Sequence, residues 1–108
     1  MIRSPIRRRA PMGYRPRSRK ELRKARKDAL ERGGYRCEAA LPGCSCRPEH
    51  AHHRKMRSQG GPDEAANLLM VCWSCHRSIH ADPERSYERG FLVRSFDDPR
   101  RTPVRRGE

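Results

Sequence analysis

The chain has 108 residues, a formal net charge of +13 and a hydrophobic fraction of 33%. This length suits a single domain, and the sequence contains no run of about 18 apolar residues that could cross a bilayer. With one Trp, two Phe and three Tyr the core is thin, so we expect disulfides or a bound metal to reinforce it.

The five cysteines favour metal ligation over disulfides. The N-terminal region lacks the apolar stretch of a secretory signal, so we expect the protein in the cytoplasm, where disulfides rarely persist. The odd number of cysteines also argues against a fully paired set. The large positive charge predicts a polyanionic partner, nucleic acid first and an anionic membrane surface second. Charge of this kind predicts phosphate binding and does not by itself predict cleavage.

Residues 1–17 combine clustered arginines with three prolines and are predicted to be a disordered basic arm. An organelle transit peptide is the alternative, which the prolines disfavour. A helix is expected to begin at Ser18, because Ser18 and Glu21 have the spacing of a capping box. Gly33 and Gly34 are expected to end it.

Residues 35–50 are rich in turn residues and contain three cysteines, which is typical of a metal knuckle. Residues 51–55 are expected to form a short strand. Residues 57–66 are expected to be irregular because Gly60, Gly61 and Pro62 interrupt them.

An apolar run over 68–71 predicts a second strand, and residues 73–81 predict a helix ended by Pro83. Residues 90–95 are a candidate closing strand. The tail is expected to be a flexible basic segment over 96–108. The domain itself is therefore predicted to span 18–95.

All five histidines lie between residues 50 and 80. His76 and His80 are four residues apart on the predicted helix, so their imidazoles can share one ion. His52 is the best candidate for a third ligand, and three protein ligands leave positions open for water and phosphate, as a catalytic metal requires. His53 is then available as a general base, since histidine ordinarily titrates near pH 6.5. Asn67 could orient His53 through its side chain or its backbone.

A strand normally sends adjacent side chains to opposite faces. His52 and His53 therefore require either a local distortion or an ion that lies near the edge of the strand.

A second, structural zinc is predicted at Cys72 and Cys75, a C-x-x-C pair that can clamp one ion. Cys37 together with Cys44 or Cys46 would complete the tetrahedron, and His50 could replace one thiolate. A competing assignment places a single zinc on the pair together with the two helix histidines, Cys72, Cys75, His76 and His80.

The run HHRKMRSQGGPDEAANLLMVCWSCHRSIH resembles the HNH (His-Asn-His) endonuclease motif, in particular that of small tailed-phage proteins. The resemblance covers residues 35–95. It implies a small α+β fold: a ββα-metal finger with a four-cysteine zinc knuckle, preceded by the N-terminal helix. Cysteine spacing in similar phage proteins favours Cys44 over Cys46.

The resemblance implies a metal-dependent DNA endonuclease, which nicks one strand or cleaves both, with His53 as general base and Asn67 orienting it. It also implies that His52, His76 and His80 hold a catalytic ion, which could be Mg²⁺, Mn²⁺, Ni²⁺ or Zn²⁺. His80 is the less certain ligand, because fewer relatives have both helix histidines. Four basic residues near the motif are candidates for holding flanking phosphates: Arg54, Lys55, Arg57 and Arg77.

The implied partners are DNA and, for a phage protein, the terminase during genome packaging in the host cytoplasm. Homing and restriction are alternative roles. A zinc-ribbon protein that binds nucleic acid without catalysis would also explain the charge and the cysteines, but it does not explain the spacing of the histidines and Asn67.

Overall fold

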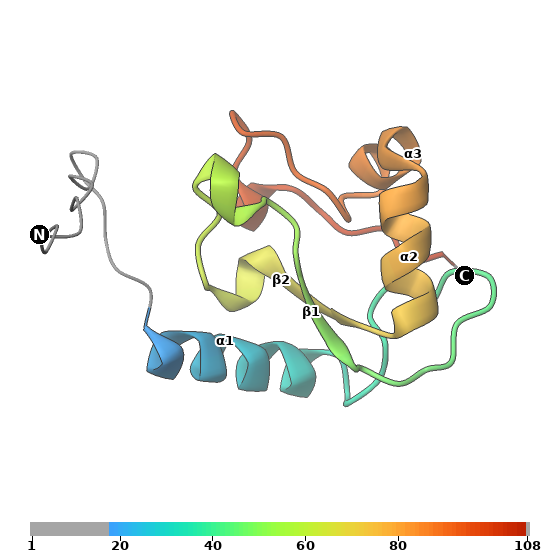
Figure 1. The fold of residues 1–108 in the computed structure, drawn as a ribbon, viewed down its shortest axis with the longest axis horizontal. Coiled ribbons are helices and arrows are strands. Elements are labelled where there is room, and N and C mark those ends of the chain that lie inside the picture. Colours follow the sequence, from blue (N-terminus) through green and yellow to red (C-terminus); the bar gives the residue numbers. More distant parts are fainter. Residues whose placement is uncertain (1–17, 108) are drawn as a thin grey trace, which may run out of the picture.

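A computed structural model describes residues 18–107, and the predicted basic arm over 1–17 lies outside that range. The fold is small and of the α+β type, with a two-stranded antiparallel sheet held between helices (Figure 1). Helix α1, Arg19–Arg32, covers one face of the sheet, and α2, Trp73–Ala81, lies on the other. None of the helices in the described range is long and apolar enough to cross a membrane.

Helix α1 begins and ends where the sequence predicts. The Ser18 hydroxyl accepts a hydrogen bond from the backbone N–H of Glu21, which satisfies one of the free donors of the first turn. At the other end Gly33 caps the helix, and Gly34 adopts φ +64°, the left-handed conformation that glycine tolerates best. Ala25 and Ala29 are buried against the sheet.

The sheet consists of β1, His50–His53, and β2, Leu68–Val71. The register pairs His52 with Leu69 and His53 with Leu68. Leu68 and Leu69 belong to different core clusters, one against α1 and the other against α2, so the sheet is packed on both faces. The first strand thus begins one residue earlier and ends two residues earlier than predicted, whereas β2 and α2 have their predicted bounds.

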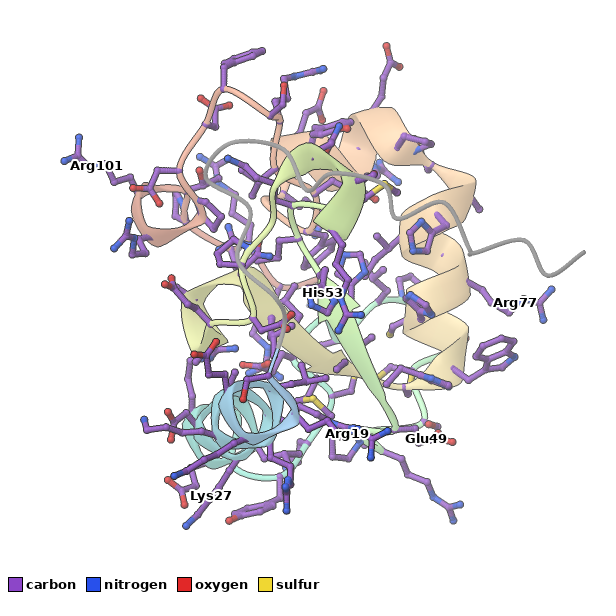
Figure 2. The ribbon with its side chains drawn as sticks, turned by 60° about the vertical axis from the view of Figure 1, so that its left-hand side comes forward. Arg19, Lys27, Glu49, His53, Arg77 and Arg101 are labelled. Carbon is purple, nitrogen blue, oxygen red and sulfur yellow. The ribbon has the colours of Figure 1, made fainter. Side chains whose placement is uncertain are left out.

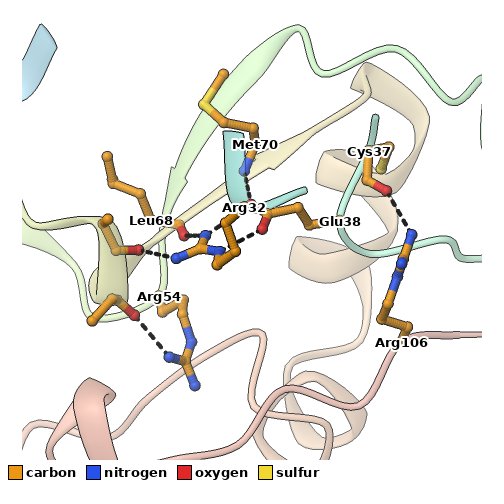
Figure 3. A network of polar contacts seen from close by, with 9 residues as sticks. Arg32, Cys37, Glu38, Arg54, Leu68, Met70 and Arg106 are labelled. Carbon is orange, nitrogen blue, oxygen red and sulfur yellow. Dashed lines mark hydrogen bonds and ion pairs between the residues drawn. The ribbon is translucent and has the colours of Figure 1, made fainter. Parts of the chain in front are cut away.

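The outer edge of β2 is closed by a salt bridge between Arg32, the last residue of α1, and Glu38 (Figure 3). Arg32 donates to both carboxylate oxygens of Glu38 and also to the carbonyl of Leu68. Glu38 in turn accepts from the backbone N–H of Met70 at 2.8 Å. These contacts satisfy backbone groups that an edge strand would otherwise leave open.

The segment after α2 differs from its prediction in two respects. Pro83 does not simply end the helical region but starts a further helix, α3, Pro83–Glu88, with Asp82 as its N-cap. Proline suits this first position because its missing N–H has no partner there in any case. The predicted closing strand over 90–95 is wrong: this segment is irregular, although Phe91, Leu92 and Val93 are buried.

The tail, predicted to be flexible, packs across the domain in the structure. A 3₁₀ turn spans Pro99–Arg101, and beyond it the N–H groups of Arg105 and Gly107 bond to the carbonyls of Arg89 and Ala39. The buried Gly90 permits this path, since a Cβ there would lie 2.1 Å from the Pro103 carbonyl oxygen.

Candidate metal centres and active site

Four thiols converge where the knuckle meets the start of α2. The sulfur atoms of Cys37, Cys44, Cys72 and Cys75 lie within 4.8 Å of one another. The Sγ atoms of Cys44 and Cys72 are 3.9 Å apart, close to the ~3.8 Å expected for two sulfurs each about 2.3 Å from one tetrahedral zinc. The donor set therefore fits a structural zinc.

The knuckle backbone selects Cys44 over Cys46. Cys46 is exposed and lies outside the sulfur cluster, with φ +67°. Its role is in the backbone, because its carbonyl accepts from the N–H of Cys37 and its own N–H donates to the sulfur of Cys44. His50 is also outside the cluster.

The Cys72 sulfur sits at the N-cap of α2, where the backbone N–H of Cys75 donates to it at 3.3 Å. Burial raises the pKa of this thiol, but hydrogen bonds from the backbone N–H groups of Cys75 and Ser45 outweigh that effect and lower it to about 6. Burial raises the pKa of Cys44 to about 11. The fold alone therefore favours the thiolate form at Cys72 and not at Cys44, and a bound divalent cation would stabilise the thiolate form of both.

Three imidazoles form a second cluster between β1 and α2. One ring nitrogen from each of His52, His76 and His80 lies within 4.8 Å of the others. The Nε2 atoms of His76 and His80 are 3.1 Å apart, near the ~3.3 Å expected of two nitrogens bound about 2.0–2.1 Å from one ion. The fold therefore places these residues together as the spacing predicts, and the donor set fits a divalent ion with open positions.

A hydrogen bond to the Phe91 carbonyl fixes the orientation of the His52 ring and the nitrogen that is free to bind an ion. Its Nε2–H donates to the carbonyl of Phe91 at 2.7 Å, which leaves Nδ1 with the free electron pair. Burial lowers the pKa of His52 to about 4, helped by the charges of His76 and His80 and opposed by the hydrogen bond to Phe91. Burial and its histidine neighbours also lower the pKa of His76. Both rings are therefore neutral near pH 7, the state in which imidazole binds metals.

His53, the residue after His52, pairs with a carboxylate that sequence reasoning missed. Its Nε2 is 2.8 Å from Oδ1 of Asp63, whose side chain is 5% exposed, and Arg57 lies 3.6 Å from the same oxygen. Since a carboxylate oxygen accepts, the proton is on Nε2 and Nδ1 is left as the basic nitrogen. Only the position of Asp63 in a glycine-rich loop just before Asn67 could have indicated this partner.

Two ways for Asn67 to orient His53 were predicted, through its side chain or through its backbone. The side chain has other hydrogen-bond partners than the His53 ring. Its fully buried amide spans the loop instead: Oδ1 accepts from the N–H of Lys55, and Nδ2 donates to the carbonyls of Lys55 and Pro62. Asn67 thereby fixes the residue that precedes Asp63, and its backbone carbonyl binds the N–H of Arg54, next to His53.

Gly61 closes the same loop by a close backbone approach. A Cβ at this position would lie 1.8 Å from the carbonyl oxygen of Lys55, so only glycine fits there without a shift of the backbone. The path of the loop that carries Asp63 therefore depends on Gly61 as well as on Asn67.

The prediction that Arg54 holds a flanking phosphate is wrong. Arg54 is 3% exposed, and its guanidinium donates to four backbone carbonyls, those of Gly90, Ala66, Pro99 and Thr102. Burial lowers its pKa to about 10. Arg54 therefore anchors the tail to the end of β1.

The other three predicted phosphate ligands differ in their exposure and in their contacts. Lys55 is half-buried with its ammonium on the Ser95 carbonyl, and Arg57 is exposed beside Asp63. Arg77 is exposed and projects from the side of α2 that faces away from His53 (Figure 2). Arg57 is thus the basic side chain with a direct link to the His53 site.

An antiparallel hairpin followed by a helix, with imidazoles gathered between them, defines a ββα-metal fold. In the comparison with protein families, residues 37–82 match the HNH endonuclease model, so this part of the chain is similar to HNH domains. Proteins of that family are in general nucleases that use a divalent metal and act on DNA. Comparisons with curated proteins and with solved structures gave no significant match.

Proposed function

We propose that this protein is a metal-dependent DNA endonuclease that hydrolyses phosphodiester bonds, with His53 as the general base. One observation carries the proposal: three imidazoles converge at the end of a hairpin where His53, the residue after His52, is held by a buried carboxylate. A zinc-binding module without catalysis would need the four cysteines but neither of these features.

His52, His76 and His80 would hold one divalent ion, and four cysteines would hold a structural zinc: Cys37, Cys44, Cys72 and Cys75. When bound by the imidazoles, a divalent ion supplies electrostatic stabilisation of the charge that develops on the phosphate and on the leaving 3′ oxygen. The ion could be Mg²⁺, Mn²⁺, Ni²⁺ or Zn²⁺, since nitrogen ligands accept several such ions.

The proton transfer falls to His53. Its Nδ1 removes a proton from water as the water oxygen bonds to phosphorus and the bond to the 3′ oxygen breaks, which leaves a 5′ phosphate. Asp63 accepts from Nε2–H throughout, so it fixes the tautomer and stabilises the imidazolium that forms. Asn67 acts as a positioning residue, because it closes the loop that presents Asp63.

DNA would be held by cations around the site, with the exposed Arg57 closest to His53 and with the half-buried Lys55 and the exposed Arg77 farther out. The charge of +13 supplies long-range attraction to the phosphate backbone. We expect binding to weaken steeply with salt because neutralised phosphates release their counterions.

Plasmid nicking tests the proposal. Zinc-loaded protein is incubated with supercoiled plasmid and Mg²⁺, Mn²⁺ or Ni²⁺, beside His53→Ala as the matched variant. Nicking by the wild type, lost in the variant while DNA binding persists, supports the proposal. Equal DNA binding by both proteins with no nicking under any ion would instead identify a non-catalytic zinc-ribbon protein.

The proposal extends to genome packaging with a phage terminase in the host cytoplasm, on the likeness of the motif order to small HNH proteins of tailed phages. The test is to repeat the nicking assay with purified terminase large subunit. Stimulated cleavage supports this role, and unchanged cleavage with no complex formation removes it.

A further inference from the structure

The chain's one tryptophan is exposed beside the histidine cluster. Trp73 is 53% exposed, although large aromatic side chains are usually well buried. Its ring is nevertheless held in place: the ring centroid is 4.9 Å from that of His50 and 6.3 Å from that of His76.

Helix geometry joins this ring to the ion site. Trp73 is the first residue of α2, and His76 and His80 follow it by three and seven residues, so all three share one stripe of the helix. His50, the first residue of β1, stacks on His76 with ring centroids 5.5 Å apart. Trp73, His50 and His76 thus form a continuous aromatic row from the start of α2 to the histidine cluster.

We propose that this aromatic row receives an unstacked nucleobase of the strand that is cut. The substrate class would then be DNA whose nucleotide beside the scissile phosphate is unpaired or easily extruded, such as a single strand, a gap or a branch. This inference rests on the proposed function and deepens it.

The chemistry of the row matches such a ligand. An exposed indole offers a π face on which any base can stack, and the basic chain attracts the adjoining phosphates. In an intact duplex each base already stacks on its neighbours, so its face is not free. The row lies next to the ion site, so a base that stacks there brings its own phosphate to the histidines.

Intrinsic fluorescence tests the inference because Trp73 is the chain's one indole. Protein that carries one zinc per chain, at the four cysteines, has no ion at the histidines and is therefore unable to cut. It is titrated with a short single-stranded DNA and with the same sequence as a duplex. We expect the single strand to quench the emission strongly and the duplex to quench it weakly. Trp73→Ala should weaken single-strand binding roughly 5- to 100-fold and leave duplex binding unchanged, whereas Trp73→Phe retains most of the affinity.

The matched control is Phe96→Ala, which removes another exposed aromatic side chain, 81% exposed, and should change neither affinity. Two results would overturn the inference: unchanged emission while the anisotropy of a labelled single strand reports binding, or equal weakening of both ligands in Trp73→Ala. The inference and the proposed function fail separately. If the protein nicks plasmid but DNA leaves the Trp73 emission unchanged, only the stacking site is refuted. If DNA quenches the emission but the protein does not nick plasmid, only the nuclease proposal is refuted.

Discussion

Replacing Asn67 with alanine should loosen the loop that carries Asp63. The substitution removes three hydrogen bonds, at 2.8, 3.0 and 3.0 Å, and leaves backbone groups of Lys55 and Pro62 without this partner. At about 1 kcal/mol for each bond, the free energy of unfolding should fall by about 3 kcal/mol. For a domain of this size, that lowers Tm by roughly 12–24 °C.

Differential scanning calorimetry of the zinc-loaded protein measures this shift, with Ser58→Ala, an exposed position in the same loop, as the control. The control should melt within about 4 °C of the wild type, because surface substitutions usually change the free energy of unfolding by no more than about 0.5 kcal/mol. At a temperature where both variants remain folded, Asn67→Ala should also nick plasmid more slowly. A Tm for Asn67→Ala that matches the control would refute the argument that this amide closes the loop.

Three further outcomes follow from the structure. Strong chelators should unfold the protein, which circular dichroism would report as a loss of helical signal. Cys44→Ser should abolish tight zinc binding, whereas Cys46→Ser should retain it. Tight zinc binding by Cys44→Ser and its loss in Cys46→Ser would refute the four-cysteine assignment. The pKa of His52, about 4 in the fold against 6.5 unfolded, gives stability that is complete above pH 6.5 and is lost as pH falls towards 4. At pH 5 the loss is about 2 kcal/mol, so denaturant titrations should show a steeper pH dependence for the wild type than for His52→Gln, and equal slopes would contradict this. Asp63→Asn should lower the nicking rate about 10- to 100-fold with DNA binding unchanged, whereas an unaltered rate would show that His53 needs no carboxylate.

Local signals in the sequence predicted the elements that build the site. Ser18, Glu21 and the following glycines fixed α1, and the apolar run of β2 and the spacing of α2 gave bounds that the structure reproduces. The spacing of cysteines and histidines on α2 also predicted the sulfur cluster and the imidazole cluster. Ligands on one face of a helix need only one neighbouring strand or knuckle to complete each set.

The features that escaped prediction depend on contacts between distant parts of the chain. Arg54 looks like any other member of a basic run, yet its partners lie 12 to 48 residues away. Those bonds hold the tail that composition alone marks as flexible. Residues 90–95 have the composition of a strand, but Gly90 and the returning tail turn them into a largely buried irregular segment.

The partner of His53 was hidden for a related reason. Strand alternation predicted that His52 and His53 diverge, and their different partners agree with this. What meets His53 on its own side depends on how the loop folds back, and Asn67 and Gly61 determine that path through backbone contacts. Asp63 lies in a loop ten residues after His53, and no rule of sequence spacing predicts a contact between two such residues.

The proposed function requires that the three imidazoles bind one ion whose presence enables hydrolysis beside His53. Its most direct test is to titrate zinc-loaded protein with Ni²⁺ while calorimetry follows binding and supercoiled plasmid reports nicking in matched samples. We expect one nickel per chain, a nicking rate that rises in proportion to occupancy, and a parallel shift of both curves to higher concentration in His80→Ala. A filled histidine site without nicking, or nicking that His80→Ala leaves unchanged while binding weakens, would contradict it.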